Sequence, residues 1–157
     1  MRMLSNKKNI IIIAAVVLII ILLLTLCGKD DKAKAESVAK NFIEYLVKGN
    51  TSKAAALMSD LAVEESGSAT RKIFESKFAN TTQNRFSNIS VTKIKVVDSY
   101  FDEVIDPYNP IYGYDVVRTV LEYSYEKERL FTDEKGTGNL TVTVIKEGNS
   151  WRVYRFA

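Results

Sequence analysis

Few residue types in this chain of 157 residues could do chemistry. It contains no histidine and one cysteine. A zinc site of the usual kind needs several Cys or His ligands, and Ser–His or Cys–His nucleophilic pairs need a histidine. The composition therefore excludes these sites, and a single cysteine also excludes an intramolecular disulfide. We expect no catalytic residue, no metal and no cofactor, and we interpret the protein as a non-enzyme.

Acidic residues supply the remaining candidates for chemistry. Asp102, Glu103 and Asp106 lie in one Pro-containing segment and could in principle hold calcium, but no EF-hand pattern or glycine pivot accompanies them. The adjacent Glu64 and Glu65 would point apart on a helix or loop. We interpret both groups as solvated. An enzymatic function would instead require a carboxylate or tyrosine pair buried together in a cleft.

Aromatic residues gather in the second half of the chain. Large amphipathic side chains can line a ligand pocket or an interface, and they also serve as ordinary sheet packing. Both interpretations stay open. The candidates for a pocket or interface are Tyr112, Tyr114, Tyr123, Tyr125 and Trp151.

An apolar N-terminal segment is predicted to hold the rest of the chain at a membrane. The run from Ile10 to Leu26 is apolar except for Thr25 and follows Lys7 and Lys8. About 17 to 18 residues at ~1.5 Å each make a helix of roughly 27 Å, close to the thickness of the hydrocarbon core of a bilayer. We predict a transmembrane signal anchor over residues 10–27. By the positive-inside rule, residues 1–9 form a cytoplasmic basic tail and the C-terminal domain is extracytoplasmic.

Cys27 leaves a second interpretation of this segment open. Leu24–Cys27 (LTLC) resembles the lipobox of bacterial lipoproteins, in which the cysteine receives lipid. Leu26 departs from that pattern, since Gly, Ala or Ser is favoured there. Cys27 could otherwise be a small apolar residue at the interface end of the helix, and simple secretion is a third alternative.

The charge balance bears on the partners of the domain outside the membrane. The formal net charge is +3, but Arg2, Lys7 and Lys8 all precede the apolar run, and the residues after Cys27 carry 19 basic and 19 acidic side chains. A balanced domain gives no indication of a nucleic-acid surface. We expect the membrane as one partner, and another protein or a second copy as the other, with a small ligand as the alternative.

The periodicity of the remaining chain predicts helices first and strands afterwards. After a charged spacer at 28–34, helices are expected at 35–48 and at about Lys53–Ala62. A third helix, capped by Ser68, is expected to run to about Asn80 with Ile73, Phe74 and Phe78 facing inward. Strands are expected at Ile89–Tyr100 with a bulge near Lys93, along a segment that includes both Tyr112 and Tyr125, and on both sides of a hairpin at Gly148–Asn149. Asp133–Gly138 reads as a turn. This order predicts an α+β domain over 35–157, with three helices packed on a curved antiparallel sheet of about four strands.

Two stretches resemble a known superfamily. Residues 35–60 (AESVAKNFIEYLVKGNTSKAAALMSD) and the ending GNSWRVYRF resemble the opening and the last strand of the nuclear transport factor 2-like superfamily. The resemblance implies a cone-like domain whose concave sheet face can enclose a pocket. The superfamily includes enzymes, ligand binders and structural modules. The Asp–His type of acid–base set that its enzymes often use cannot be built without histidine.

The combination of anchor and outer domain suggests a role at the cell envelope. It resembles the scaffold subunits of type IV secretion and conjugation complexes, small extracytoplasmic lipoproteins, and the non-catalytic N-terminal domain of some penicillin-binding proteins. The prediction is a non-enzymatic, membrane-anchored interaction or scaffold domain, such as an accessory subunit of an envelope complex. A membrane-tethered small-ligand or lipid-binding lipoprotein is the alternative.

Overall fold

A computed structural model describes residues 30–86, 89–127 and 134–157, and the chain divides into two compact units, Met1–Ala33 and Lys34–Ala157. Only the helical residues 30–33 of the first unit are described. The apolar run and Cys27, with the anchor predicted there, lie outside the described residues. Within the described ranges, no helix combines the length and apolarity needed to cross a bilayer.

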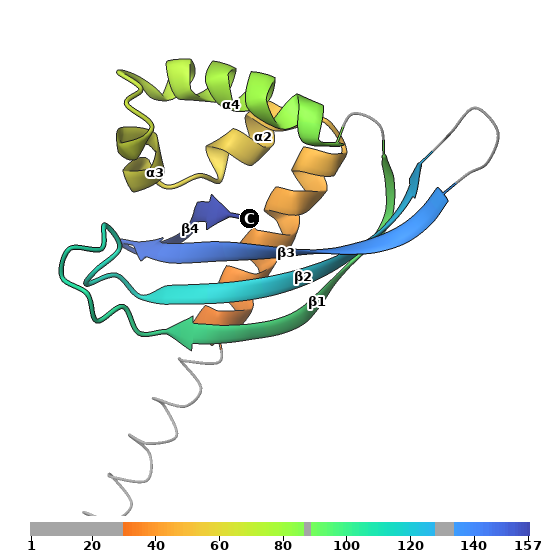
Figure 1. Ribbon diagram of the computed structural model, residues 1–157. Helices are drawn as coiled ribbons and strands as arrows, with labels where there is room; N and C mark the ends of the chain where they lie inside the picture. The colour runs from red at the N-terminus through yellow and green to blue at the C-terminus, as the bar shows by residue number, and fades with distance from the viewer. Residues whose placement is uncertain (1–29, 87–88, 128–133) are drawn as a thin grey trace, which may run out of the picture. The chain divides into compact units, whose positions relative to one another are not determined.

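The second unit is an α+β domain in which helices come first and a sheet follows. A helix over 34–47 is followed by α2 (Thr51–Ala56), α3 (Asp60–Glu65) and α4 (Arg71–Phe86). The strands are β1 (Ser90–Asp102), β2 (Val116–Lys127), β3 (Glu134–Glu147) and β4 (Ser150–Phe156), and all neighbours are antiparallel in the order β1-β2-β3-β4. The sheet is visibly curved in Figure 1. The predicted fold class and four-stranded sheet are confirmed.

The helices bury their apolar side chains against one face of this sheet. Phe42 and Ile43 on the first helix are fully buried, as are Leu121 on β2 and Val142 on β3. The ring of Phe42 lies 5.0 Å from that of Phe156 on β4, and Phe78 of α4 lies 6.2 Å from Phe156. Edge-to-face aromatic contacts of this kind add to the free energy gained from burial. The aromatic cluster therefore joins the helical layer to the last strand.

The predicted single helix Lys53–Ala62 is wrong, because the chain leaves helical geometry after α2 and resumes it in α3. Between them, Met58 forms a parallel bridge with Val153 of β4. The Val153 N–H donates to the Leu57 carbonyl at 2.8 Å, and the Ser59 N–H donates to the Val153 carbonyl at 2.7 Å. The pairing satisfies backbone groups that β4 would otherwise expose at its edge. Residues 57–59 thus cover this edge, and the described part of the domain has four helices where three were predicted.

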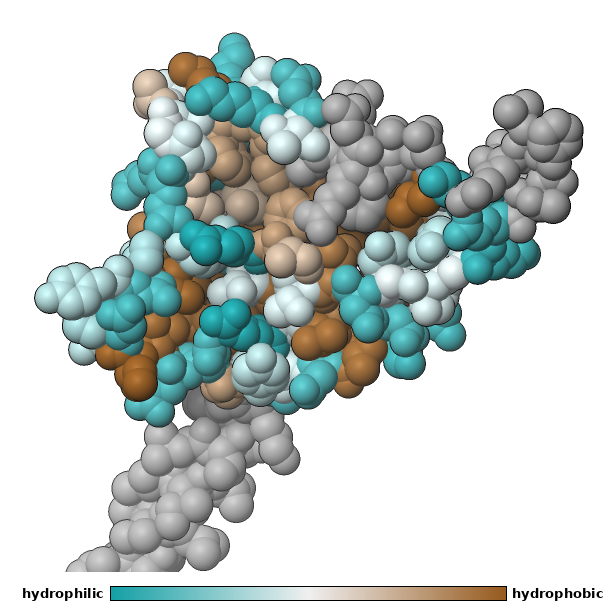
Figure 2. All heavy atoms as spheres, in the orientation of Figure 1, coloured by the Kyte–Doolittle hydropathy of each residue, from teal (hydrophilic) through white to brown (hydrophobic). Residues whose placement is uncertain are grey.

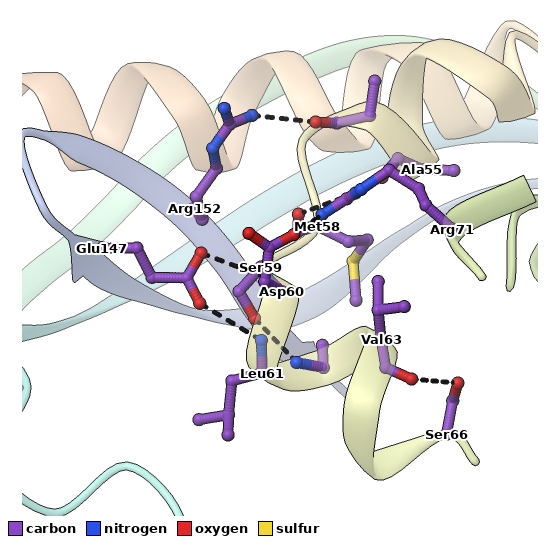
Figure 3. Close-up of polar contacts among 12 residues, drawn as sticks. Ala55, Met58, Ser59, Asp60, Leu61, Val63, Ser66, Arg71, Glu147 and Arg152 are labelled. Atoms are coloured by element: carbon purple, nitrogen blue, oxygen red, sulfur yellow. Dashed lines mark hydrogen bonds and ion pairs between the residues drawn. The ribbon is translucent and has the colours of Figure 1, made fainter. Parts of the chain in front are cut away.

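Side chains fix both ends of this bridge segment (Figure 3). The Ser59 hydroxyl accepts from the Ala62 N–H at 3.0 Å, which caps α3. The Glu147 carboxylate accepts from the N–H groups of Asp60 and Leu61 at 3.1 and 3.2 Å. Arg71 donates to the carbonyls of Ala55 and Met58 and forms an ion pair with Asp60. These polar contacts outweigh the helical periodicity of the segment.

Helix α4 begins at Arg71, later than predicted. Its first turn is capped by Thr70, whose hydroxyl accepts from the Ile73 N–H at 3.3 Å, and not by Ser68. Phe74 and Phe78 are buried as predicted, whereas Ile73 is exposed. Ile73 lies about 100° around the helix from Phe74, so it falls outside the stripe of Phe74 and Phe78 that faces the core.

The strands differ from prediction at two boundaries. The bulge near Lys93 is confirmed, and a second register shift lies between Val96 and Asp98. Tyr112 and Tyr114 were predicted to lie on the second strand. This prediction is wrong, because β2 begins at Val116. The predicted turn at Asp133–Gly138 is wrong from Glu134 onward, because Gly136 and Gly138 pair with Tyr125 and Tyr123 inside the β2–β3 ladder. Glycine usually weakens a strand, and these two are explained below by the rings that cover them.

The cap of α3 yields a test of the bridge segment. Replacing Ser59 with Ala removes the acceptor for the Ala62 N–H in a buried position, and we expect a loss of about 1 kcal/mol in the free energy of unfolding. Denaturant unfolding measures the change. Ser52→Ala on the exposed surface of α2 is the matched control and should leave the stability unchanged or slightly raised.

Candidate functional site

Tyr112 and Tyr114 lie in the loop between β1 and β2, which spans residues 103–115. Successive turns hold the loop: the N–H groups of Asn109, Tyr112 and Tyr114 donate to the carbonyls of Asp106, Asn109 and Ile111 at 2.9 to 3.2 Å. Its end is joined to β3, where the Lys146 N–H donates to the Asp115 carbonyl at 3.0 Å. The loop is therefore an ordered structure with internal hydrogen bonds.

One buried side chain anchors the loop to the sheet. Ile111 is 3% exposed and belongs to the same apolar cluster as Val116 and Ile145. Side chains alternate along a strand, so Val116 and Ile145 point away from the face that Val117 and Val144 present to the helices. The loop thus covers the opposite face at this end of the sheet.

The exposed large hydrophobic side chains concentrate at this loop and the strand that enters it. Eight such side chains are exposed in the part of the chain that the structure describes, and seven of them fall within residues 97–114. Tyr108 is 93% exposed and Ile105 is 80% exposed. Figure 2 shows apolar side chains interleaved with hydrophilic ones where this loop lies. The seven, called here the 97–114 surface, are Val97, Tyr100, Phe101, Ile105, Tyr108, Tyr112 and Tyr114.

The same segment carries a one-sided charge. Residues 96–117 contain five acidic side chains and no Lys or Arg. Asp102 pairs with Arg118 at 2.6 Å, and Asp115 lies 4.0 Å from Lys146. Asp98, Glu103 and Asp106 have no ion pair within the described residues. The apolar surface is therefore bordered by negative charge.

Tyr123 and Tyr125 lie elsewhere, at the far end of β2. Their rings, 6.0 Å apart, cover Gly138 and Gly136 on β3. A Cβ added at Gly138 would come within 2.5 Å of the Tyr123 ring, and one at Gly136 within 2.7 Å of the Tyr125 ring. These tyrosines are packed on strand glycines, which is a structural role. The spacing Tyr-x-Tyr opposite Gly-x-Gly was a sequence signal for this pairing.

Trp151 is buried on β4, opposite Lys146 of β3. The Lys146 ammonium lies 5.7 Å from the centre of the indole ring. The indole N–H has no hydrogen-bond partner in the described part of the chain. The five aromatic candidates thus fall into three separate places, and only Tyr112 and Tyr114 belong to an exposed surface.

The acidic candidates also separate. Asp102 ends β1 and is paired with Arg118, so it is not the solvated loop residue that was predicted. Asp106 accepts from the Tyr108 N–H at 3.0 Å and shapes the loop. Glu64 is exposed, whereas Glu65 accepts from the Tyr154 hydroxyl at 2.7 Å. Within the ranges described, no three His, Cys, Asp or Glu side chains gather as metal ligands would.

Tyr154 is the group whose ionisation the fold changes most clearly. Burial raises the pKa of its phenol above the usual 10.0, the hydrogen bond to the Glu65 carboxylate raises it further, and the nearby Arg155 guanidinium opposes both. The neutral phenol is therefore the form that the folded state favours. Besides Trp151 and Tyr154, the buried polar side chains of the described residues are uncharged hydroxyls: Ser59, Ser99, Thr119 and Thr143.

Several cavities border the sheet in the described part of the chain. One of about 480 Å³ lies between the end of the first helix, at Glu44 and Val47, and the start of β1 at Ile89–Ile94. One of about 400 Å³ lies beside Tyr125 and Gly136. A third, of about 200 Å³, lies beneath the loop and is lined by Asn109, Pro110, Ile111, Arg118, Thr143, Tyr154 and Arg155.

Comparisons with known proteins bear on the backbone arrangement alone. No protein-family model and no curated protein sequence matches the chain. Aln2 from a Streptomyces species is similar in structure, with 11% identity and a TM-score of 0.46 over 80% of this chain and 86% of that one. A ketosteroid isomerase-like protein from Erwinia carotovora atroseptica has 11% identity and a TM-score of 0.47 over 80% of this chain and 92% of that one. Similarity at this level transfers neither a site nor an activity.

The tyrosine–glycine packing predicts a coupling between two positions. Gly138→Ala should displace the Tyr123 ring and lower the free energy of unfolding by about 1–2 kcal/mol. In a Tyr123→Ala background the same change should cost almost nothing, since no ring remains to be displaced. Denaturant unfolding of the two single variants and the double variant measures the coupling. Equal costs in both backgrounds would show that the ring does not constrain Gly138.

The raised pKa of Tyr154 predicts a specific pH dependence. Because the folded pKa lies above the unfolded value of about 10, this group's stabilisation is complete below pH 10 and is lost as the pH rises through the folded pKa. Tyr154→Phe should cost about 1–2 kcal/mol at pH 7 through loss of the bond to Glu65, and should flatten the decline above pH 10. Unfolding midpoints measured from pH 7 to 11 test this, and an unchanged slope in the variant would contradict it.

Proposed function

We propose that residues 35–157 form a non-enzymatic, extracytoplasmic protein-interaction domain of the nuclear transport factor 2-like type, tethered to the membrane by the N-terminal segment. The observation that carries the proposal is the 97–114 surface, where seven large hydrophobic side chains are exposed on one ordered segment. Exposed apolar side chains that gather on one segment of a folded domain are typical of binding sites. The helices and sheet then serve to hold this surface rigid.

The order of the loop favours binding with little loss of conformational freedom. The buried Ile111 and the turns around Asp106 and Asn109 fix the backbone from which Tyr108 and Tyr112 project. An interface formed from residues that are already ordered avoids much of the entropic cost of association. Tyrosine also offers a large contact area with few rotatable bonds, which is why it is frequent at the centre of interfaces.

The charge of the segment favours a protein over the lipid surface as its partner. Bacterial and other anionic membranes attract Lys and Arg and repel acidic side chains. Residues 96–117 carry five acids and no base, so a partner surface with basic residues around an apolar centre is complementary. An accessory or scaffold role in an envelope complex, such as a type IV secretion or conjugation machine, agrees with this chemistry.

Site-specific crosslinking tests the proposal in intact cells. A photo-crosslinking amino acid placed at Tyr112 of the full chain should trap a discrete protein, and Ile105→Ser with Tyr108→Ala should lower the yield by about tenfold, since two exposed anchors are removed. The matched control is Ile73→Ser, which removes the exposed hydrophobic residue outside the surface. An adduct of twice the chain's mass would identify the partner as a second copy. Exclusive crosslinking to lipid, or an unchanged yield in the double variant, would refute the proposal.

The mode of membrane attachment has its own test. We infer that residues 10–27 hold the domain at the membrane, either as a signal anchor or through lipid on Cys27. Cys27→Ser should leave a helical anchor in the membrane fraction but release a chain held only by lipid. Fractionation of cells with and without alkaline extraction distinguishes the two. Recovery of the unmodified wild-type chain in the soluble fraction would contradict both.

A small-ligand or lipid-binding role is the second candidate. It is favoured by the cavity of about 480 Å³ between the first helix and β1, where Val47, Ile89 and Ile94 supply apolar surface. Native mass spectrometry of the full chain in mild detergent should then show a stoichiometric small molecule. Ile94→Glu would place a charge in this cavity and should abolish that adduct.

A further inference from the structure

The cavity beneath the loop lies on the sheet face that Val116 and Ile145 share, and at β4 two of its lining residues, Tyr154 and Arg155, contact Glu65 of α3. Arg118 of β2 pairs with Thr143 of β3, and Thr143 pairs with Arg155 of β4, so these three side chains form a row across the strands. Residues 109–111 of the loop also line the cavity, and its volume is about 200 Å³. We propose that this cavity is a binding pocket for a single carboxylate group.

Hydrogen-bond donors dominate the walls of the pocket. Arg118 donates its Nε–H to Asp102 at 2.6 Å, and its two terminal nitrogens form no hydrogen bond within the described residues. The Thr143 hydroxyl is likewise without a partner there. The side-chain oxygen of Asn109 accepts from the Ile111 N–H at 3.2 Å, which leaves its amide group as a donor. No carboxylate is among the residues that line the cavity.

The neighbouring acids decide which anion the pocket takes. Arg118 already faces Asp102, and Arg155 lies 3.5 Å from Glu65. Each guanidinium is thus largely neutralised on one side, and the remaining positive potential suits a monoanion better than a phosphate dianion. The terminal nitrogens of an arginine also match the two oxygens of a planar carboxylate.

The position of the pocket connects it with the 97–114 surface. Asn109, Pro110 and Ile111 roof the cavity and lie between Tyr108 and Tyr112 in the chain. A protein that covers these tyrosines can therefore place an acidic side chain or its C-terminus in the pocket. This inference rests on the proposed function. It predicts that the partner's surface, which is otherwise basic, carries one carboxylate that enters the pocket. Such a pairing would reject partners that lack the carboxylate.

Titration with small acids tests the pocket without any protein partner. In the full chain in detergent micelles, sodium acetate should shift the amide resonances of Thr143 and Arg155 saturably, compared with sodium chloride at equal ionic strength. Arg155→Gln should weaken the acetate affinity by about tenfold. The control Arg152→Gln, on the same strand but outside the cavity, should leave it unchanged. Thr143→Val, which keeps the shape and the charges, should weaken binding as well and serves if Arg155→Gln fails to fold.

Further probes separate the outcomes. N-acetylalanine carries only a terminal carboxylate, and the α-amide of N-acetylglutamate carries only a side-chain carboxylate, so the tighter binder identifies the source of the group. Shifts equal to those with chloride, or tighter binding of inorganic phosphate than of acetate, would overturn the inference. These results are independent of the crosslinking yield at Tyr112, so failure of the pocket and failure of the proposed function can be told apart.

Discussion

A sheet that is apolar on both faces at one end is the constraint on which the rest of the structure depends. At the start of β2, Val116 and Val117 point to opposite faces, and both are buried. The helices cover only one of these faces. The other must be covered by the connection between β1 and β2, and Ile111 does this. Burial of that side chain, together with the hydrogen-bonded turns of the loop, keeps this 13-residue connection ordered.

Order in the loop has consequences for binding. A connection that must cover the sheet has to present its remaining side chains outward, and here those include Ile105 and Tyr108. The same coverage creates the cavity between the loop and the row of Arg118, Thr143 and Arg155. A surface for apolar contact and a pocket for a charged group therefore arise from one packing requirement. The proposed function therefore uses the loop and its cavity for recognition, whereas the resemblance to the nuclear transport factor 2-like superfamily suggested the concave face.

The two edges of the sheet, β4 and β1, differ in how their backbone groups are covered. Residues 57–59 pair with β4, so that edge is covered by the chain itself. In the described part of the chain, β1 has β2 as its one neighbour, and two register shifts interrupt the pairing between them. Bulges and the lysines at 93 and 95 disfavour uncontrolled strand pairing there. Binding through the loop is thus compatible with an edge that is protected against aggregation.

Local patterns in the sequence determined the class of the fold, the order of helices and strands, the bulge near Lys93 and the hairpin at Gly148–Asn149, because periodicity and turn chemistry act over a few residues. They also located the aromatic-rich region, but not which of its members are exposed. Only the tertiary structure decided that Tyr112 and Tyr114 lie on a loop, that Tyr123 and Tyr125 cover strand glycines, and that Trp151 is buried. Likewise, the break between α2 and α3 and the cavity beneath the loop depend on pairs such as Met58 with Val153 and Arg118 with Thr143. These partners are far apart in the chain, and a contact between distant residues leaves no periodic signal in either segment.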